Sequence, residues 1–391
     1  MTFHMGARKS SIVIAAALFA VGCVNESTGA KAELPADVGA ANAGGSLAVI
    51  KLTSNQKDIA PNRAPSLING WGLVPFDRKF WIAANGSGDV VILDGKGVPS
   101  KGKPKSGAID LGKGITGVAV TGAKADDTAF QIHTAKDCKP AQLIFGSETG
   151  KLFGVNTELS DKRGFEVVDR SSAGAIYKGV AVVHESHDAY GSHGRLILAT
   201  DFHNGHVDVF NERFKLLEDK DIKFAAEVGA GFAPFNVMVF EDTVYVTYAK
   251  QDEDKEDDVA GPGLGFVVAF DTSGTPLGIA KEGALNAPWG LALARGFGPF
   301  PSSLLVANFG DGRITAIETP TKPTPGTVPL LGQLGQLTDR HGAPIAIEGL
   351  WGISFGPLVE NARPDGLYFA AGPNGEKNGL FGVIAPTSAH R

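Results

Sequence analysis

The chain has 391 residues, a net charge of −6, a hydrophobic content of 43% and 52 glycines. This length suits two ordinary domains or one large all-β domain, and a glycine-rich but normally hydrophobic composition favours a folded core with many turns over disorder. The acidic balance, with no basic stripe, argues against a nucleic-acid partner.

The first 22 residues have the pattern of a secretory signal peptide. A basic pair precedes the apolar run 12–21, which is too short to span a bilayer, and small residues precede Cys23. Small residues before a cysteine resemble a bacterial lipobox, although Ala20 stands where such sites usually have Leu. We expect residues 1–22 to be removed and Cys23 to carry a lipid that anchors the exported protein to the bacterial envelope, on the periplasmic or cell-surface side. The alternative is an ordinary cleaved signal with an incidental cysteine.

Residues 23–45 follow as a predicted flexible tether. They are mostly small and polar and show no apolar periodicity. A flexible segment of about 22 residues spans roughly 25 Å. The folded domain is then expected over residues 46–385, with a short tail at 386–391.

A repeated phrase organises the rest of the chain. Three of the four tryptophans begin the phrases Trp71-Gly72-Leu73, Trp289-Gly290-Leu291 and Trp351-Gly352-Ile353. Alignment on the glycine predicts six units with intervals of 45, 62, 57, 54 and 62 residues, centred on Gly72, Gly117, Gly179, Asn236, Gly290 and Gly352. Units of this size hold four short strands, as in a propeller blade.

Each unit is expected to contain an inner strand at the phrase, followed by two apolar strands joined by a glycine-rich turn. The first of these apolar strands is predicted at residues 80–84, 143–146, 196–200, 244–248, 304–307 and 367–371. The second is predicted at residues 90–93, 152–155, 207–210, 266–270, 314–317 and 380–384.

Few residues remain after the last predicted strand, so the sixth unit needs its outer strand from elsewhere. The apolar segment 47–52, which precedes the first phrase, can supply it. Sharing one blade between the two ends would close the ring and leave only short edges. We therefore predict an all-β fold, a six-bladed β-propeller closed by an N-terminal strand, with a β-solenoid as the competing architecture.

Several segments resemble one family of secreted bacterial proteins, known mainly as conserved hypothetical proteins. They are residues 69–73 (NGWGL), 232–236 (FAPFN), 248–252 (YAKQD), 257–261 (DDVAG), 287–291 (APWGL), 308–313 (NFGDGR) and 372–374 (GPN). Some members carry a C-terminal PEP-CTERM sorting signal, which this chain does not show. The resemblance covers about residues 50–385 and implies a fold distantly similar to NHL-repeat and gluconolactonase-type propellers, with no established activity.

The mouth of the central channel is the predicted ligand site. In a propeller the start of each inner strand and the end of the next strand lie on one face. Trp71, Trp289 and Trp351 are therefore expected to line a funnel together with Lys250 and Asn374. Such an aromatic funnel suits a small molecule. The alternative is that the tryptophans only wedge the blades apart.

Oxygen donors at the same strand ends form a candidate metal site. Glu148, Asn85, Asp201 and Asn308 could hold Ca²⁺ or another divalent cation, because hard cations prefer oxygen ligands. Gluconolactonase-type propellers hold a divalent metal with a comparable set. The competing interpretation is that these residues form turns, since Asn and Asp side chains bond the nearby backbone.

Two further features lie in turns on the same face. His203 and His206 flank a tight turn in the third unit and could face the funnel or point apart. The acidic run 252–258 is expected to be a solvated loop, with Ca²⁺ binding as the alternative.

These features favour an envelope-anchored propeller that binds a small ligand or a partner protein at the channel mouth. A second hypothesis is a metal-dependent hydrolase or lyase of gluconolactonase type, in which Glu148 or Asp201 acts as base while the cation polarises a carbonyl. A third is a structural role in the envelope. The chain contains no nucleophile elbow, phosphate-binding loop or zinc-protease motif.

Overall fold

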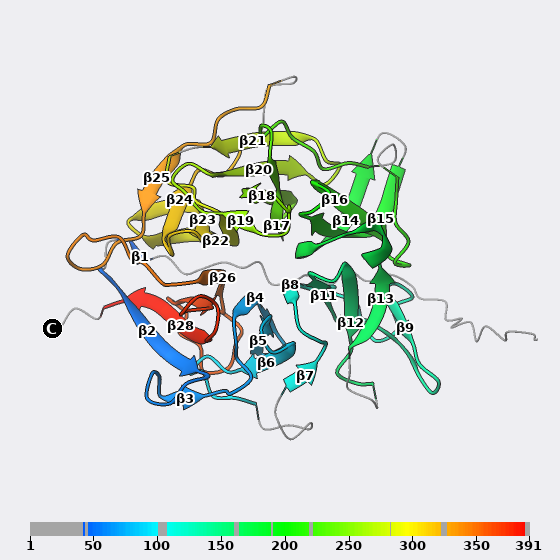
Figure 1. The fold of residues 1–391 in the computed structure, drawn as a ribbon, viewed down its shortest axis with the longest axis horizontal. Helices are drawn as coiled ribbons and strands as arrows, with labels where there is room; N and C mark the ends of the chain where they lie inside the picture. Colours follow the sequence, from blue (N-terminus) through cyan, green and yellow to red (C-terminus); the bar gives the residue numbers. More distant parts are fainter. Residues whose placement is uncertain are drawn as a thin grey trace, which may run out of the picture.

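Six β-sheets surround a common axis in the computed structural model (Figure 1). The structure describes residues 42–43, 46–100, 108–159, 164–188, 191–218, 222–281, 283–321 and 327–387. Within these ranges the chain forms strands and one 3-10 turn (η1, Ser171–Ala173), with no α-helix. The predicted six-bladed all-β propeller is therefore confirmed, and the β-solenoid alternative is wrong.

Blades 1 to 3 follow one another along the chain and run from the inner strand outward. Blade 1 contains β4 (Gly70–Phe76), β5 (Lys79–Ala84), β6 (Asp89–Leu93) and β7 (Ala108–Asp110). Blade 2 contains β8 (Ile115–Val120), β11 (Leu143–Ser147), β12 (Lys151–Val155) and β13 (Phe165–Asp169), and the hairpin β9 (Gln131–His133) and β10 (Cys138–Pro140) lies between its first two strands in sequence. Blade 3 contains β14 (Tyr177–Asp188), β15 (Gly191–Asp201) and β16 (His206–Asn211).

Blades 4 to 6 complete the ring. Blade 4 contains β17 (Phe232–Phe240), β18 (Thr243–Gln251), β20 (Gly265–Asp271) and β21 (Pro276–Lys281), with β19 (Asp258–Val259) added to the end of β18. Blade 5 contains β22 (Pro288–Gly298), β23 (Phe300–Asn308), β24 (Ile314–Ile317) and β25 (Gln333–Gln336). Blade 6 contains β26 (Leu350–Phe355), β27 (Leu367–Ala371), β28 (Leu380–Pro386), β2 (Leu47–Ser54) and β3 (Asn62–Arg63).

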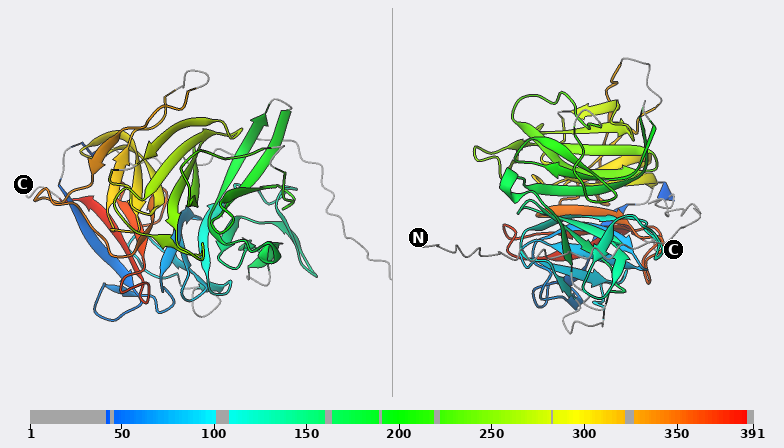
Figure 2. Two further views of the ribbon diagram at one scale, coloured as in Figure 1. Left: turned by 45° about the horizontal axis from the view of Figure 1, so that its top comes forward. Right: turned by 90° about the vertical axis from the view of Figure 1, so that its right-hand side faces the viewer.

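The first long strand closes the ring, as predicted. Strand β2 runs antiparallel to β28, with Leu47 opposite Pro386 and Ser54 opposite Leu380. The two strands lie side by side although they come from opposite ends of the chain (Figure 1 and the left view of Figure 2). The paired strand extends two residues beyond the predicted segment 47–52.

Glycines allow the inner strands to approach one another around the axis. A Cβ added to Gly179 would lie 2.2 Å from Asn236 Oδ1, and one added to Gly290 would lie 2.2 Å from the Trp351 carbonyl oxygen. Asn236 fills the sixth position differently, because its Nδ2 donates a hydrogen bond of 2.8 Å to the Trp289 carbonyl. The repeated glycine therefore reflects strand spacing at the axis.

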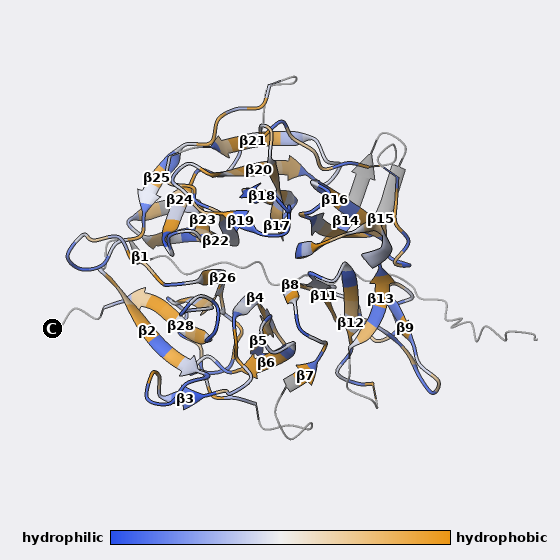
Figure 3. Cartoon of the chain, viewed as in Figure 1, coloured by the Kyte–Doolittle hydropathy of each residue, from blue (hydrophilic) through white to orange (hydrophobic). Residues whose placement is uncertain are grey.

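Apolar side chains fill the space between neighbouring blades. One buried cluster joins blades 5 and 6 and includes Leu47 from β2, Leu305 from β23 and Phe369 from β27. Hydropathy colouring shows mainly apolar strands joined by hydrophilic turns (Figure 3). Each blade therefore buries its faces against two neighbours, which is why the closing strand matters to the whole ring.

Some predicted segments fall outside the described residues. These are the signal peptide at 1–22, the lipidation site Cys23, most of the tether and the last four residues of the tail. Within the predicted tether, β1 (Asn42–Ala43) pairs in parallel with Phe297 and Gly298 of β22. The Thr387 backbone N–H donates to the Ser46 carbonyl at 2.8 Å. Among the described residues, no helix is long and apolar enough to cross a membrane.

Candidate functional site

The residue before each repeated glycine, or before Asn236 in blade 4, lies within the first four residues of an inner strand, at the same end of the channel. We call this the axial position, and its six occupants are Trp71, Thr116, Lys178, Phe235, Trp289 and Trp351. The Trp71 and Trp351 rings stack with centroids 3.7 Å apart, and Phe309 stacks on Trp351 at 3.9 Å. Trp289 meets both indoles edge-on at 5.7–5.8 Å.

Six rings form an aromatic plug, made of the buried Trp71, Phe202, Phe235, Trp289 and Trp351 and the partly buried Phe309. The three indoles are only 1–4% exposed. The expected convergence of the tryptophans is found, but they fill the end of the channel instead of lining an open wall, because offset and edge-on contacts bury large aromatic surfaces favourably.

Polar contacts orient two of the three indoles. Trp351 Nε1 donates to Asn69 Oδ1 at 3.0 Å, and Trp289 Nε1 donates to the Lys178 carbonyl at 3.3 Å. Trp71 Nε1 is buried and has no hydrogen-bond partner among the described residues. An unpaired buried donor of this kind is uncommon in folded proteins.

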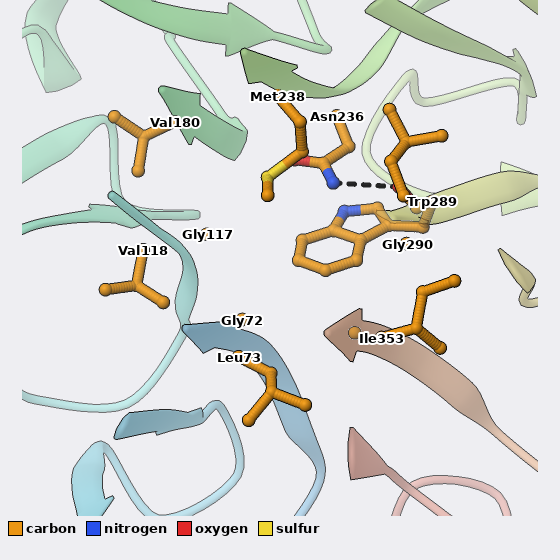
Figure 4. Close-up of a pocket in the computed structure, with 12 residues that line it drawn as sticks. Gly72, Leu73, Gly117, Val118, Val180, Asn236, Met238, Trp289, Gly290 and Ile353 are labelled. Carbon is orange, nitrogen blue, oxygen red and sulfur yellow. Dashed lines mark hydrogen bonds between the residues drawn. The ribbon is translucent and has the colours of Figure 1, made fainter. Parts of the chain in front are cut away.

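Beyond the plug, the channel is narrow and mainly apolar. Val118, Val180, Met238 and Ile353 line it, together with four of the repeated glycines, Gly72, Gly117, Gly290 and Gly352 (Figure 4). The polar chemistry therefore lies on the other side of the plug, where charged side chains reach solvent.

Lys178 is the central charged group of that side. The residue is 1% exposed, and its Nζ lies 2.6 Å from Glu148 Oε1 and 3.0 Å from Asp257 Oδ1. The same Nζ lies 5.4 Å from the Trp71 ring centroid and 5.9 Å from that of Phe202. Burial opposes the charge, but the two carboxylates outweigh it and raise the pKa of Lys178, so the group is an ammonium.

Two further carboxylates complete what we call the mouth cluster, which consists of Lys178, Glu148, Asp257, Asp258 and Glu376. Burial, followed by repulsion from Asp257 and Glu376, raises the pKa of Asp258 to about 7, against the attraction of Lys178. Its Oδ2 is buried and has no hydrogen-bond partner among the described residues. Burial, together with Glu148 and Asp257, likewise raises the pKa of Glu376.

Amide side chains connect these carboxylates across blades. Asn85 Nδ2 donates to Glu148 Oε2 at 2.8 Å, and Asn69 Nδ2 donates to Glu376 Oε1 at 3.0 Å. Asn69 also contacts Asn85 at 3.4 Å. The mouth cluster and these amides together therefore draw on blades 1, 2, 3, 4 and 6.

Among the four expected metal ligands, hydrogen bonding brings together Asn85 and Glu148, whereas Asp201 and Asn308 bond to other partners, and a metal role for the set stays a prediction. Asn85 and Glu148 are in contact, but Asp201 accepts hydrogen bonds from the Ile176 and Asn204 backbone and from Asn204 Nδ2. Asn308 is fully buried and is bonded to neighbouring residues of blade 5. The Lys178 ammonium neutralises the charge of Glu148 in this structure. Asp201 and Asn308 thus adopt the local turn contacts that compete with ligation.

The other two expected ligand contacts bond to groups outside the mouth cluster. Lys250 Nζ donates to the Ala230 carbonyl at 3.2 Å and lies over the Phe232 ring. Asn374 is exposed, and its backbone N–H donates to Glu348 Oε1 at 2.8 Å. Their role in ligand binding stays a prediction, as does that of the three tryptophans.

A separate polar network lies in blade 3. His206 Nε2 is 3.0 Å from Asp208 Oδ1, and Tyr177 OH donates to Asp208 Oδ2 at 2.6 Å. Ligand atoms of Asp201, His206 and Asp208 lie within 4.8 Å of one another. The hydrogen bond to Asp208 raises the pKa of His206. Each carboxylate oxygen of this network already has a hydrogen-bond partner.

Sequence reasoning missed Lys178 and Glu376 and treated Asp257 and Asp258 as loop residues. Lys178 carries a usable signal, since it directly precedes Gly179 and so occupies the axial position held by tryptophan in three other blades. Glu376 carries no such signal, because its loop reaches the cluster only in the closed ring.

Comparisons with known proteins yield distant relatives only. No model of a protein family matches the chain. One uncharacterised protein of Acanthamoeba polyphaga mimivirus is 25% identical over 347 residues, which cover 85% of this chain and 84% of the relative. Another from the same virus is 26% identical over 356 residues, covering 85% of this chain and 78% of the relative. Because these relatives are viral, membership in a bacterial secreted family stays a prediction.

Solved structures with similar folds are more distant still. A protein of unknown function from Bacteroides thetaiotaomicron has a TM-score of 0.49 and 11% identity, covering 87% of this chain and 76% of that one. Virginiamycin B lyase from Staphylococcus aureus has a TM-score of 0.40 and 12% identity, covering 87% and 99%. A gluconolactonase from Xanthomonas campestris has a TM-score of 0.37 and 14% identity, covering 81% and 98%. Likenesses at this level assign no activity to this chain.

Proposed function

We propose that this β-propeller binds a small ligand at the mouth of its central channel, with the mouth cluster as the recognising surface. The buried ammonium of Lys178 carries the proposal. Three other blades place tryptophan at the same axial position, and an apolar group there would extend the plug without burying a charge. A buried ion pair is often less stable than a well-packed apolar replacement, so a charged residue at this point favours a binding role over a purely structural one.

The Lys178→Met variant tests this proposal. Glu148 and Asp257 keep 30% and 77% of their side-chain surface exposed, so water can solvate them once the ammonium is gone. We expect the free energy of unfolding of the variant to lie within about 1 kcal/mol of the wild-type value, because apolar packing against the plug offsets the lost ion pair. Ligand affinity should change by at least about tenfold, because the ammonium attracts an anionic ligand group and repels a cationic one.

A screen of amines, sugars, sugar acids and amino acids by intrinsic tryptophan fluorescence and thermal shift provides the measurement. Lys178 lies over Trp71, so a ligand that displaces or covers the ammonium should change the emission of the plug. The matched control is Lys79→Met, which removes a lysine from a surface ion pair with Glu360. A ligand response with the same affinity in Lys178→Met as in the wild type, or a wild-type protein that responds to no ligand, would contradict the proposal.

Asp258 favours a second function, acid–base catalysis at the same mouth. A carboxyl group with a pKa of about 7 can exchange a proton with a bound substrate near neutral pH, while an adjacent ammonium stabilises negative charge on a substrate oxygen. The rates of lactone hydrolysis and of β-elimination, measured with the purified protein, test this function. If the protein is an enzyme, Asp258→Asn should lower the rate by about 10²–10⁴-fold, whereas Asp254→Asn on the same loop should not.

We also propose that Cys23 carries a lipid anchor and that the propeller faces the periplasm or the cell surface. The basic and apolar N-terminal pattern and the small residues before Cys23 support this proposal. Cys23→Ser should move the protein from the membrane fraction to the soluble fraction. If Cys23→Ser does not change the fractionation, the proposed lipid anchor is contradicted.

A further inference from the structure

The mouth cluster contains one ammonium for four carboxylates. Lys178 makes its two short contacts to Glu148 and Asp257. Asp258 and Glu376 interact with Lys178 only at longer range, and each is repelled by Asp257. The cluster is therefore short of positive charge on its Asp258 and Glu376 side.

The hydrogen-bond pattern shows the same deficit. Ionised carboxylates only accept hydrogen bonds. Glu376 receives one, from Asn69 Nδ2, and Asp258 Oδ2 receives none although it is buried. An unpaired buried acceptor costs roughly 1–3 kcal/mol, so a group that donates to it would be bound favourably.

The surroundings of the cluster favour a positively charged ligand. Asp257 is 77% exposed and connects the cluster to the exposed acidic residues of the loop between β18 and β19, namely Glu253, Asp254 and Glu256. This loop also contains the exposed Lys255, but its net charge is negative, and a rim of net negative charge attracts cations and raises their local concentration. Below the cluster, the aromatic faces of Trp71 and Phe202 already accommodate one ammonium.

We propose that the ligand of the mouth cluster is a small organic cation, whose ammonium group is held by Asp258 and Glu376 beside Lys178. This inference rests on the proposed function and names its ligand class. An alkylammonium group brings up to three donors and a positive charge, which match the two under-bonded carboxylates. At neutral pH such a ligand should expel a proton from Asp258, whose charged neighbours are Lys178, Asp257 and Glu376.

Isothermal titration calorimetry of the full chain tests the inference. The probe is 1,4-diaminobutane, compared with uncharged 1,4-butanediol, dianionic succinate and calcium chloride. We expect the diamine to bind at least about tenfold more tightly than the diol or succinate. Titrations at pH 7 in two buffers of different ionisation enthalpy should show proton release by the wild type but not by Asp258→Asn.

Isosteric variants locate the site. Asp258→Asn and Glu376→Gln should each weaken diamine binding by at least about tenfold. Asp242→Asn removes an exposed negative charge from the turn between β17 and β18, at the other end of β18 from the cluster, and should change binding by less than about twofold, consistent with a screened surface charge. If Asp258→Asn does not fold, Glu376→Gln provides the same comparison.

Several results would overturn the inference. These are a diamine that does not bind, one that binds no better than the diol, one insensitive to both variants, and calcium binding alone with the same variant sensitivity. A neutral or anionic ligand that depends on Lys178 in the fluorescence screen would also reject the cation and leave the proposed function standing. A protein that responds to no ligand would reject both.

Discussion

Lys178 and Asp258 show how single residues give this propeller its chemistry. Lys178 keeps its charge in an aromatic setting because Glu148 and Asp257 outweigh the cost of burial. Asp258 experiences the opposite balance, since desolvation and neighbouring carboxylates outweigh the attraction of Lys178. Perturbed groups of this kind gather at functional sites more often than elsewhere.

The raised pKa of Asp258 predicts a specific dependence of stability on pH. Its folded-state pKa of about 7 exceeds its ordinary value of 3.8. The stabilisation of the fold by the protonated carboxyl is therefore fully present below pH 3.8 and is lost as the pH rises through 7. Between pH 4 and pH 8 the wild type should lose up to about 4 kcal/mol that Asp258→Asn does not lose.

Urea unfolding of both proteins at pH 4, 6 and 8 measures this difference. Comparison with the isosteric variant cancels the titrating groups that do not interact with Asp258, whereas Glu376, whose pKa is also raised, interacts with Asp258 and contributes to the difference. Parallel stability curves for the two proteins would show that Asp258 ionises normally.

The inner strands owe their spacing to the repeated glycines and to Asn236. Around Gly179 the strands β14 and β17 lie so close that an added Cβ would meet Asn236 Oδ1 at 2.2 Å and its Cα at 2.7 Å. Backbone atoms cannot move aside as a flexible side chain can, so the inner strands would have to separate.

Gly179→Ala should therefore destabilise the fold by about 2–3 kcal/mol, the usual cost of overpacking. Gly146→Ala is the matched control in β11. Its added Cβ would meet Thr116 Oγ1 at 3.2 Å and nothing else within 3.6 Å. We expect the control to change the unfolding free energy by less than about 1 kcal/mol, because alanine also costs less entropy than glycine in a strand. Equal losses in the two variants would contradict the role given to the inner-strand spacing.

The ring as a whole depends on a strand from the start of the folded domain. β2 completes blade 6 through its pairing with β28, and Leu47 packs into the cluster between blades 5 and 6. A defect in this strand should therefore affect both ends of the chain at once.

Leu47→Asp tests this closure. Leu47 is 1% exposed, so the buried carboxylate should cost about 3–5 kcal/mol through lost packing and desolvation. Val49→Asp lies on the same strand at 39% exposure and should cost less than about 1 kcal/mol. Chemical unfolding followed by circular dichroism measures the free energy of unfolding of both variants. Similar losses in the two variants would show that the buried face of β2 does not stabilise the closure of blade 6.

The sequence alone determined the number of blades, the main strands and the closing strand, because each depends on local patterns: apolar runs, glycine turns and a phrase recurring about once per blade. Only the tertiary structure decided which polar groups form the site. Glu376 meets Asn69 across 307 residues of sequence, and the expected ligands Asp201 and Asn308 are held by contacts within their own blades. The tryptophans, placed correctly at the axis, proved to be buried by one another. Local patterns specify strands, whereas the direction and partners of a side chain depend on neighbours that the closed ring brings together.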